Sequence, residues 1–239
     1  MSTGVLLLHG SSGTPDLDRA RLLEAEGYDV LAPAWPVQAE VALEAFPLDE
    51  LEDRNERIVV MGSSWGAEAA LLLGALDERV AAVVAFAPSA YVWGRVEEDG
   101  TQRSAWTWRG VPVPFVPYAA DWQPDEDPPS YTPMYEHSLR TAPEADSARI
   151  PVEQIRQLLL IAGGDDKVWP SVDFADEIVR RRGALPTRLV VGRAAGHRVV
   201  LPGETPKTAG QQMARGGTEA ADRELGDRAW PEILTILAG

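Results

Sequence analysis

The sequence of 239 residues contains no cysteine and only three histidines. Without cysteine the chain cannot form a disulfide, bind a metal through thiolates or use a thiol as nucleophile. The histidines, carboxylates and glycines do not follow the spacing of a metal cluster, a phosphate-binding loop or a dinucleotide-binding fingerprint. We therefore expect neither a metal nor another cofactor.

Basic residues are also scarce, 22 against 37 acidic ones, which gives a formal net charge of −15. A field of this sign repels nucleic acid and anionic membranes, so we expect neither as a partner. The first apolar run, residues 5–8, is too short for a signal peptide or a membrane span. These features favour a cytoplasmic protein that acts on a small molecule. They do not indicate an oligomeric state.

Short apolar runs alternate along the chain with segments of helical spacing. Strands are predicted over 4–8, 28–32, 58–61, 80–86, 157–162 and 187–191, and helices over 15–26, 38–51 (with a break at Pro47), 67–76, 172–182 and 219–237. This alternation predicts an α/β fold with a mostly parallel sheet and helices on both faces. The length suits a single domain, residues 1–239.

Residues from about 88 to 150 interrupt the alternation with a segment rich in tryptophan, tyrosine and proline. Disordered segments are poor in aromatic residues, and long ordered insertions are often functional. We therefore expect a lid over the site, in which Trp93, Trp106, Trp108 and Arg109 bind the substrate. The alternative is a packed surface excursion without a role in ligand binding.

The motif Gly62-Ser63-Ser64-Trp65-Gly66 lies between a predicted strand and a predicted helix. A serine between two glycines in this context is typical of a nucleophile elbow, a turn too sharp for side chains at the glycine positions. Ser64 is the residue in register, because Ser63 would require glycine at position 61, which is methionine. The motif predicts Ser64 as a nucleophile, with a chance match in an alanine-rich chain as the alternative.

Ser64, Asp166 and His197 follow the third, fifth and sixth predicted strands, whose carboxyl ends meet at one edge of the sheet. The histidine can take the serine proton, and the aspartate can orient the imidazole. Their order along the chain is that of an α/β-hydrolase fold. Asp165 competes for the carboxylate role. We favour Asp166, four residues before Pro170, and expect Asp165 to bind the turn backbone.

The backbone amides of Ser11 and Trp65 are the expected donors of an oxyanion hole, because they follow the first strand and the nucleophile. His9, beside the first of them, is expected to have a structural side chain. His137 is expected at the surface or packed in the lid.

Several stretches resemble the C-terminal catalytic domain of the acyl-CoA thioesterase and bile acid-CoA:amino acid N-acyltransferase family, above all its stand-alone bacterial members. The stretches are residues 62–68, 87–93, 106–110, 114–118, 150–155, 164–171 and 196–197. The resemblance implies an α/β-hydrolase fold, a triad of Ser64, Asp166 and His197, and acyl transfer from a thioester. The serine nucleophile implies transfer to water rather than to an amine.

Two features depart from that family. Trp65 stands where many relatives have lysine or a small residue, and the segment before Ile58 is shorter than usual. The acidic chain also offers no obvious site for the phosphates of coenzyme A, with Arg103 and Arg109 in the lid as the best local candidates. The leading hypothesis is a serine hydrolase of acyl thioesters. The alternatives are a carboxylesterase, such as a dienelactone-hydrolase-like enzyme, and a non-catalytic small-molecule binding protein with the same fold.

Overall fold

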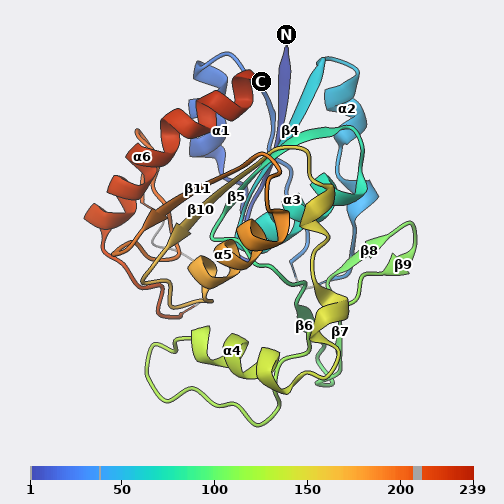
Figure 1. Cartoon of the computed structure of the whole chain (residues 1–239), viewed down its shortest axis with the longest axis vertical. Helices are drawn as coiled ribbons and strands as arrows, with labels where there is room; N and C mark the ends of the chain where they lie inside the picture. Colours follow the sequence, from blue (N-terminus) through green and yellow to red (C-terminus); the bar gives the residue numbers. More distant parts are fainter. Residues whose placement is uncertain (1, 38, 207–211) are drawn as a thin grey trace.

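A six-stranded sheet forms the centre of the computed structural model, which describes residues 2–37, 39–206 and 212–239 (Figure 1). Its strands are β1 (Thr3–Leu8), β2 (Asp29–Leu31), β4 (Arg57–Ser63), β5 (Val80–Phe86), β10 (Leu158–Gly163) and β11 (Thr187–Gly192). They lie in the order β11-β10-β5-β4-β1-β2, and all neighbours are parallel. The six predicted strands and the parallel sheet are therefore confirmed.

Helices cover both faces of the sheet, which explains why most of its strands are continuous apolar runs. Because successive side chains point to opposite faces, Leu6 and Leu8 belong to one core cluster, and Val5 and Leu7 to the other. Helices α2 (Leu48–Glu52), α3 (Trp65–Leu76) and α5 (Ser171–Arg182) contribute to the first cluster. Helices α1 (Leu17–Ala25) and α6 (Glu219–Ala238) contribute to the second.

The chain leaves β1 for β2 on one side and then crosses to β4 on the other side of β1. Such a reversal places the loops after β1 and β4 next to each other at the carboxyl edge of the sheet, where open α/β sheets bind their ligands. The loop that follows β1 contains Ser11, and the turn that follows β4 contains Ser64.

The helix predicted over 38–51 is wrong in its first part. Residue 38 lies outside the described residues, and the chain then forms strand β3 (Val41–Ala42) and the 3₁₀ turn η1 (Leu43–Ala45) before α2 begins. The physical reason is tertiary pairing: the Val41 N–H donates to Ala105 O at 2.9 Å, and β3 pairs with the strand that contains Trp106. Backbone pairing of this kind overrides local helical spacing.

The aromatic insertion is ordered and consists of small elements. These are strands β6 (Gly94–Val96), β7 (Gln102–Ser104), β8 (Trp106–Trp108) and β9 (Val111–Pro112), helix α4 (Thr132–Thr141), and the 3₁₀ turns η2 (Ala145–Ala148) and η3 (Val152–Gln154). In Figure 1, β6, β7 and α4 lie beyond the carboxyl ends of the parallel strands. The insertion thus borders the edge of the sheet at which Ser64 is found.

Candidate active site

Ser64 occupies a sharp turn between β4 and α3. Its backbone has φ 57° and ψ −120°, a conformation that residues with a side chain rarely adopt. A Cβ on Gly62 would lie 2.0 Å from Gly66 O, and one on Gly66 would lie 2.4 Å from the carbonyl oxygen of His9. Only glycine fits at either position. The local sequence therefore produces the strained elbow that the motif predicts.

Asp166 and His197 are in direct contact. Asp166 Oδ2 lies 2.8 Å from His197 Nδ1, and their side chains are only 1% and 10% exposed. The other carboxylate oxygen accepts the backbone N–H groups of Val168 at 2.9 Å and Trp169 at 3.3 Å. Since these bonds fix the carboxylate, it can in turn hold the imidazole in one tautomer, with the proton on Nδ1.

Asp165, the alternative carboxylate, turns away from the histidine. Its Oδ2 accepts the Gly217 N–H at 2.8 Å, and Oδ1 pairs with Lys167 Nζ at 3.1 Å. The Gly217 hydrogen bond, followed by Lys167, lowers the pKa of Asp165. The carboxylate that contacts His197 is therefore Asp166. Asp165 binds a distant loop rather than the backbone of its own turn.

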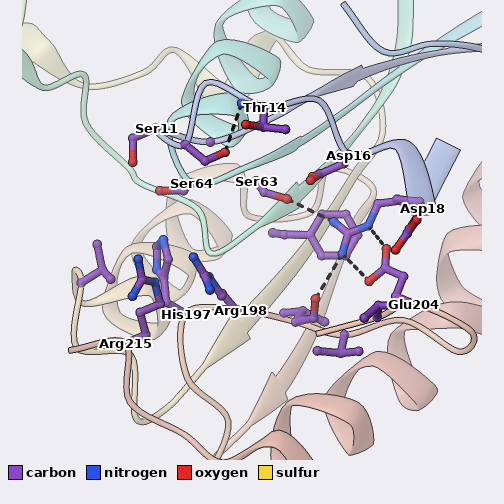
Figure 2. A pocket seen from close by; sticks show the side chains of 18 of the residues that line it. Ser11, Thr14, Asp16, Asp18, Ser63, Ser64, His197, Arg198, Glu204 and Arg215 are labelled. Atoms are coloured by element: carbon purple, nitrogen blue, oxygen red, sulfur yellow. Dashed lines mark hydrogen bonds and ion pairs between the residues drawn. The ribbon is translucent and has the colours of Figure 1, made fainter. Parts of the chain in front are cut away.

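A cavity of about 390 Å³ connects the nucleophile candidate with the histidine, since Ser64 and His197 both line it (Figure 2). Among the described residues, Ser64 Oγ has no hydrogen bond to His197 Nε2. In enzymes without substrate this contact is often long and tightens only when substrate is bound.

The loop after β1 passes directly beside the elbow. A Cβ on Gly10 would lie 3.3 Å from the Ser64 Cβ. Ser11 lines the cavity, and neither its amide nor that of Trp65 has a hydrogen-bond acceptor among the described residues. Unpaired amides next to a nucleophile are what an oxyanion hole requires.

The buried His9 side chain holds this loop in place. It stacks on Trp35 with ring centroids 4.7 Å apart, its Nδ1 lies 2.7 Å from Gly10 O, and its Nε2 accepts the Trp35 N–H at 3.3 Å. These contacts agree with the structural role expected for His9. His137, on α4, contacts the exposed Asp121 at 3.0 Å.

The four residues expected to bind substrate do not line this cavity. Trp93 and Trp106 are 0% exposed and pack in the first core cluster, where Trp106 Nε1 donates to the buried Glu68. Trp108 is half-buried, and the exposed Arg109 lies over its ring at 5.4 Å. The large apolar surface of the tryptophans fills the core beneath the insertion instead of facing the cavity next to Ser64.

A buried ion pair in the cavity wall was not foreseen from the sequence. Arg19 Nε and Nη2 donate to the two Glu204 oxygens at 2.6 and 3.0 Å, and Nη1 donates to Ser63 Oγ at 3.1 Å. Burial alone would raise the pKa of Glu204, but the charge and hydrogen bonds of Arg19 outweigh it and lower that pKa. The partners are 185 residues apart, so no local pattern indicates the pair.

Two further arginines, Arg198 and Arg215, are half-buried in the same cavity. Burial, together with the like charge of Arg215, lowers the pKa of Arg198 to about 10, and burial lowers that of Arg215. The only sequence signal for them is that Arg198 directly follows His197.

The described part of the chain contains no group of three or more histidine, aspartate or glutamate side chains able to hold a metal ion. Within the same residues, no helix has the length and apolar character needed to cross a membrane.

Comparison with solved structures finds similar folds at low sequence identity. An esterase of Pyrococcus furiosus superposes with a TM-score of 0.50 at 18% identity, over 81% of this chain and 74% of that one. A pyrethroid hydrolase of Sphingobium faniae superposes with a TM-score of 0.54 at 15% identity, over 100% and 98% of the two chains. These identities establish a common fold only.

None of the curated proteins matches this chain. A family model does match it, over residues 5–209, which is most of the sequence, and that model is described as the alpha/beta hydrolase family. With the parallel sheet and the nucleophile elbow in agreement, the chain belongs to the alpha/beta hydrolase family.

Proposed function

We propose that this hydrolase cleaves acyl esters or thioesters through an acyl-enzyme on Ser64. The observation that carries the proposal is the 2.8 Å hydrogen bond between Asp166 and His197, with the histidine lining the same cavity as the strained serine. A serine hydroxyl is a weak nucleophile at neutral pH and needs a neighbouring base, and the imidazole supplies one.

In the first half of the proposed reaction, His197 Nε2 takes the Ser64 Oγ proton while that oxygen attacks the acyl carbon. The negative charge that develops on the acyl oxygen is stabilised by the amides of Ser11 and Trp65. The imidazolium, steadied by the Asp166 carboxylate, then gives its proton to the leaving alcohol or thiol. The acyl group stays on Ser64.

In the second half, water takes the place of the leaving group. The oxygen of a water molecule attacks the acyl-enzyme while His197 accepts a proton from that water. The histidine then gives this proton to Ser64 Oγ when the ester bond to the serine breaks. The products are the free acid and the regenerated enzyme. The turn lies at the N-terminus of α3, where the positive end of the helix dipole favours negative charge on the acyl oxygen in both halves.

Acyl thioesters are the substrate class favoured by the sequence resemblance. Plain carboxylic esters are the second candidate, and the site gives a specific reason for them. Arg103 and Arg109, the expected partners of the coenzyme A phosphates, are exposed and do not line the cavity next to Ser64.

A fluorophosphonate probe tests the nucleophile. We expect the wild-type protein to be labelled on Ser64, with labelling abolished in Ser64→Ala and strongly slowed in Asp166→Asn. Asp165→Asn is the matched control, since this neighbouring carboxylate contacts Gly217 and Lys167 instead of His197. If the wild type is not labelled and no ester is cleaved, the chain is a non-catalytic binding protein with this fold.

The substrate class is tested by turnover of an acyl-CoA and a p-nitrophenyl ester that carry the same acyl group. A higher kcat/KM for the thioester supports the thioesterase hypothesis. A preference for the plain ester by orders of magnitude excludes that hypothesis and assigns a carboxylesterase.

A further inference from the structure

Two arginine side chains that the proposed reaction does not use flank the histidine. Arg198 is the next residue after His197, and Arg215 comes from the loop before α6. Figure 2 shows both guanidinium groups beside the imidazole, on the side of the cavity that faces Ser64. We refer to these two side chains as the basic pair.

The fold sets the position of Arg215 through its backbone. Its carbonyl oxygen accepts the His197 N–H at 2.9 Å, and its Nη1 donates to Met213 O at 3.1 Å. The next residue, Gly216, lies so close to the Asp165 backbone that a Cβ on the glycine would be 1.5 Å from the Asp165 carbonyl oxygen. Arg215 therefore belongs to the same packed loops as the imidazole.

The basic pair brings two positive charges together at a half-buried position, within a protein whose net charge is −15. Burial removes hydration from Arg198 and Arg215, and the two charges repel each other. The acidic side chains of the cavity, Asp16, Asp18 and Glu204, lie on its other side in Figure 2, where Glu204 is engaged by a separate arginine. An anion bound at the basic pair would reduce this repulsion.

The size of the cavity limits how far this anion can be from the reacting bond. The basic pair, Ser64 and His197 all line one space of about 390 Å³, which suits a compact ligand. The phosphates of coenzyme A are separated from the thioester sulfur by the long pantetheine arm and would lie outside it. A carboxylate a few bonds from the ester carbonyl can reach the basic pair, and planar guanidinium groups bind carboxylates with two parallel hydrogen bonds.

We propose that Arg198 and Arg215 form a carboxylate subsite, so that the enzyme selects compact esters that carry a negative charge near the scissile bond. For turnover this inference rests on the proposed function of Ser64. The carboxylate can be part of the acyl group or part of the leaving group, and the assay distinguishes the two.

The assay compares anionic esters with neutral esters of similar size. For the acyl side the pair is mono-p-nitrophenyl glutarate and p-nitrophenyl pentanoate. For the leaving-group side it is 4-acetoxybenzoate and phenyl acetate. We expect the anionic ester of at least one pair to have a kcat/KM about tenfold or more above its neutral counterpart, mainly through a lower KM, and added NaCl to reduce this ratio.

Arg198→Gln and Arg215→Gln should each lower the preferred pair's ratio of anionic to neutral kcat/KM by about tenfold to a hundredfold. The corresponding lysine variants should restore part of the ratio, because they keep the charge and lose the planar fork. Arg140→Gln, at an exposed position on α4, removes the same charge elsewhere and should leave the ratio within about twofold of the wild type.

The inference is overturned if neither anionic ester is preferred, or if the glutamine variants slow both members of a pair equally. The salt titration uses only the wild type, so a ratio of anionic to neutral kcat/KM that does not fall with added NaCl overturns the inference even if a variant does not fold. If Ser64 is unreactive and no ester turns over, the proposed function fails. Calorimetric titration with glutarate then tests the subsite alone: it stands if Arg198→Gln and Arg215→Gln weaken binding about tenfold, and falls if glutarate binds no better than neutral pentanamide.

Discussion

Replacing the buried Glu68 with glutamine should stabilise the protein at neutral and alkaline pH. Glu68 lies in the first turn of α3 and is 1% exposed. Its Oε1 accepts Trp106 Nε1–H at 2.7 Å and the Trp93 N–H at 3.3 Å, whereas the buried Oε2 has no partner among the described residues. Because a carboxylate is poorly solvated there, burial raises the pKa of Glu68 from 4.5 to about 8.

The expected magnitude follows from proton linkage. In the unfolded chain Glu68 ionises near its ordinary pKa, whereas the folded protein keeps the proton until about pH 8. The raised pKa therefore contributes stability that is fully present below pH 4.5 and is lost as the pH rises through 8. The loss is on the order of 3 kcal/mol at pH 7 and about 5 kcal/mol above pH 9.

Glutamine cannot ionise, and its Oε1 can still accept from Trp106 and Trp93. Its amide adds a donor where Oε2 was, at a cost of about 1–2 kcal/mol. We therefore expect Glu68→Gln to be slightly less stable than the wild type at pH 4.5 and more stable by about 2–4 kcal/mol at pH 8.5. Urea unfolding of both proteins across this range gives the difference directly, because every other titrating group is common to them.

Parallel stability profiles of the two proteins between pH 4.5 and 8.5 would refute this reasoning, since they would show that Glu68 has an ordinary pKa. Glu68→Ala is the control for lost hydrogen bonds. It leaves the Trp106 and Trp93 donors without an acceptor and should be destabilised by about 2–4 kcal/mol relative to Glu68→Gln at every pH.

Three further predictions concern the walls of the site. Asp166→Asn should lower kcat about ten-thousandfold, and Asp165→Asn by less than about tenfold, measured with the better substrate of the ester and thioester assays. Gly62→Ala should cost more than about 3 kcal/mol of unfolding free energy in urea, or prevent folding, since its Cβ would lie 2.0 Å from a backbone oxygen. Glu204→Gln leaves the buried Arg19 charge without its counter-charge, so the midpoint of thermal unfolding should fall, with a loss of about 3–5 kcal/mol of unfolding free energy; an unchanged midpoint would show that the ion pair adds no net stability.

The sheet could be predicted from the sequence because its signal is local. Most of its strands are buried on both faces and form continuous apolar runs, and the predicted bounds of all six lie within one or two residues of the observed ones. The segment 38–51 could not be predicted in the same way. Its conformation depends on pairing with Trp106, more than sixty positions away, and no local spacing reports such a partner.

The candidate site could likewise be predicted only in part from the sequence. The glycine pattern around Ser64 and the strand-end positions of Asp166 and His197 are visible in the sequence, and a parallel sheet brings its strand ends to one edge. The role of the tryptophans could not be predicted, because an aromatic-rich segment has the same amino-acid composition whether its aromatic residues fill a core or line a ligand site. In the structure Trp93 and Trp106 surround Glu68, and the insertion is ordered chiefly by packing.

The topology explains why Ser64 and the basic pair share a cavity although their segments are far apart in sequence. The crossover from β2 to β4 sets the loop after β1 against the elbow, and this provides the amides of Ser11 and Trp65. The segment before α6 is hydrogen-bonded to the backbone of His197 through the Arg215 carbonyl oxygen, which places Arg215 next to the histidine. The first arrangement serves any acyl group, whereas the second adds a charge requirement. Reactivity and selectivity should therefore be separable: loss of Ser64 removes both, whereas loss of Arg215 should change which esters are chosen while fluorophosphonate labelling continues.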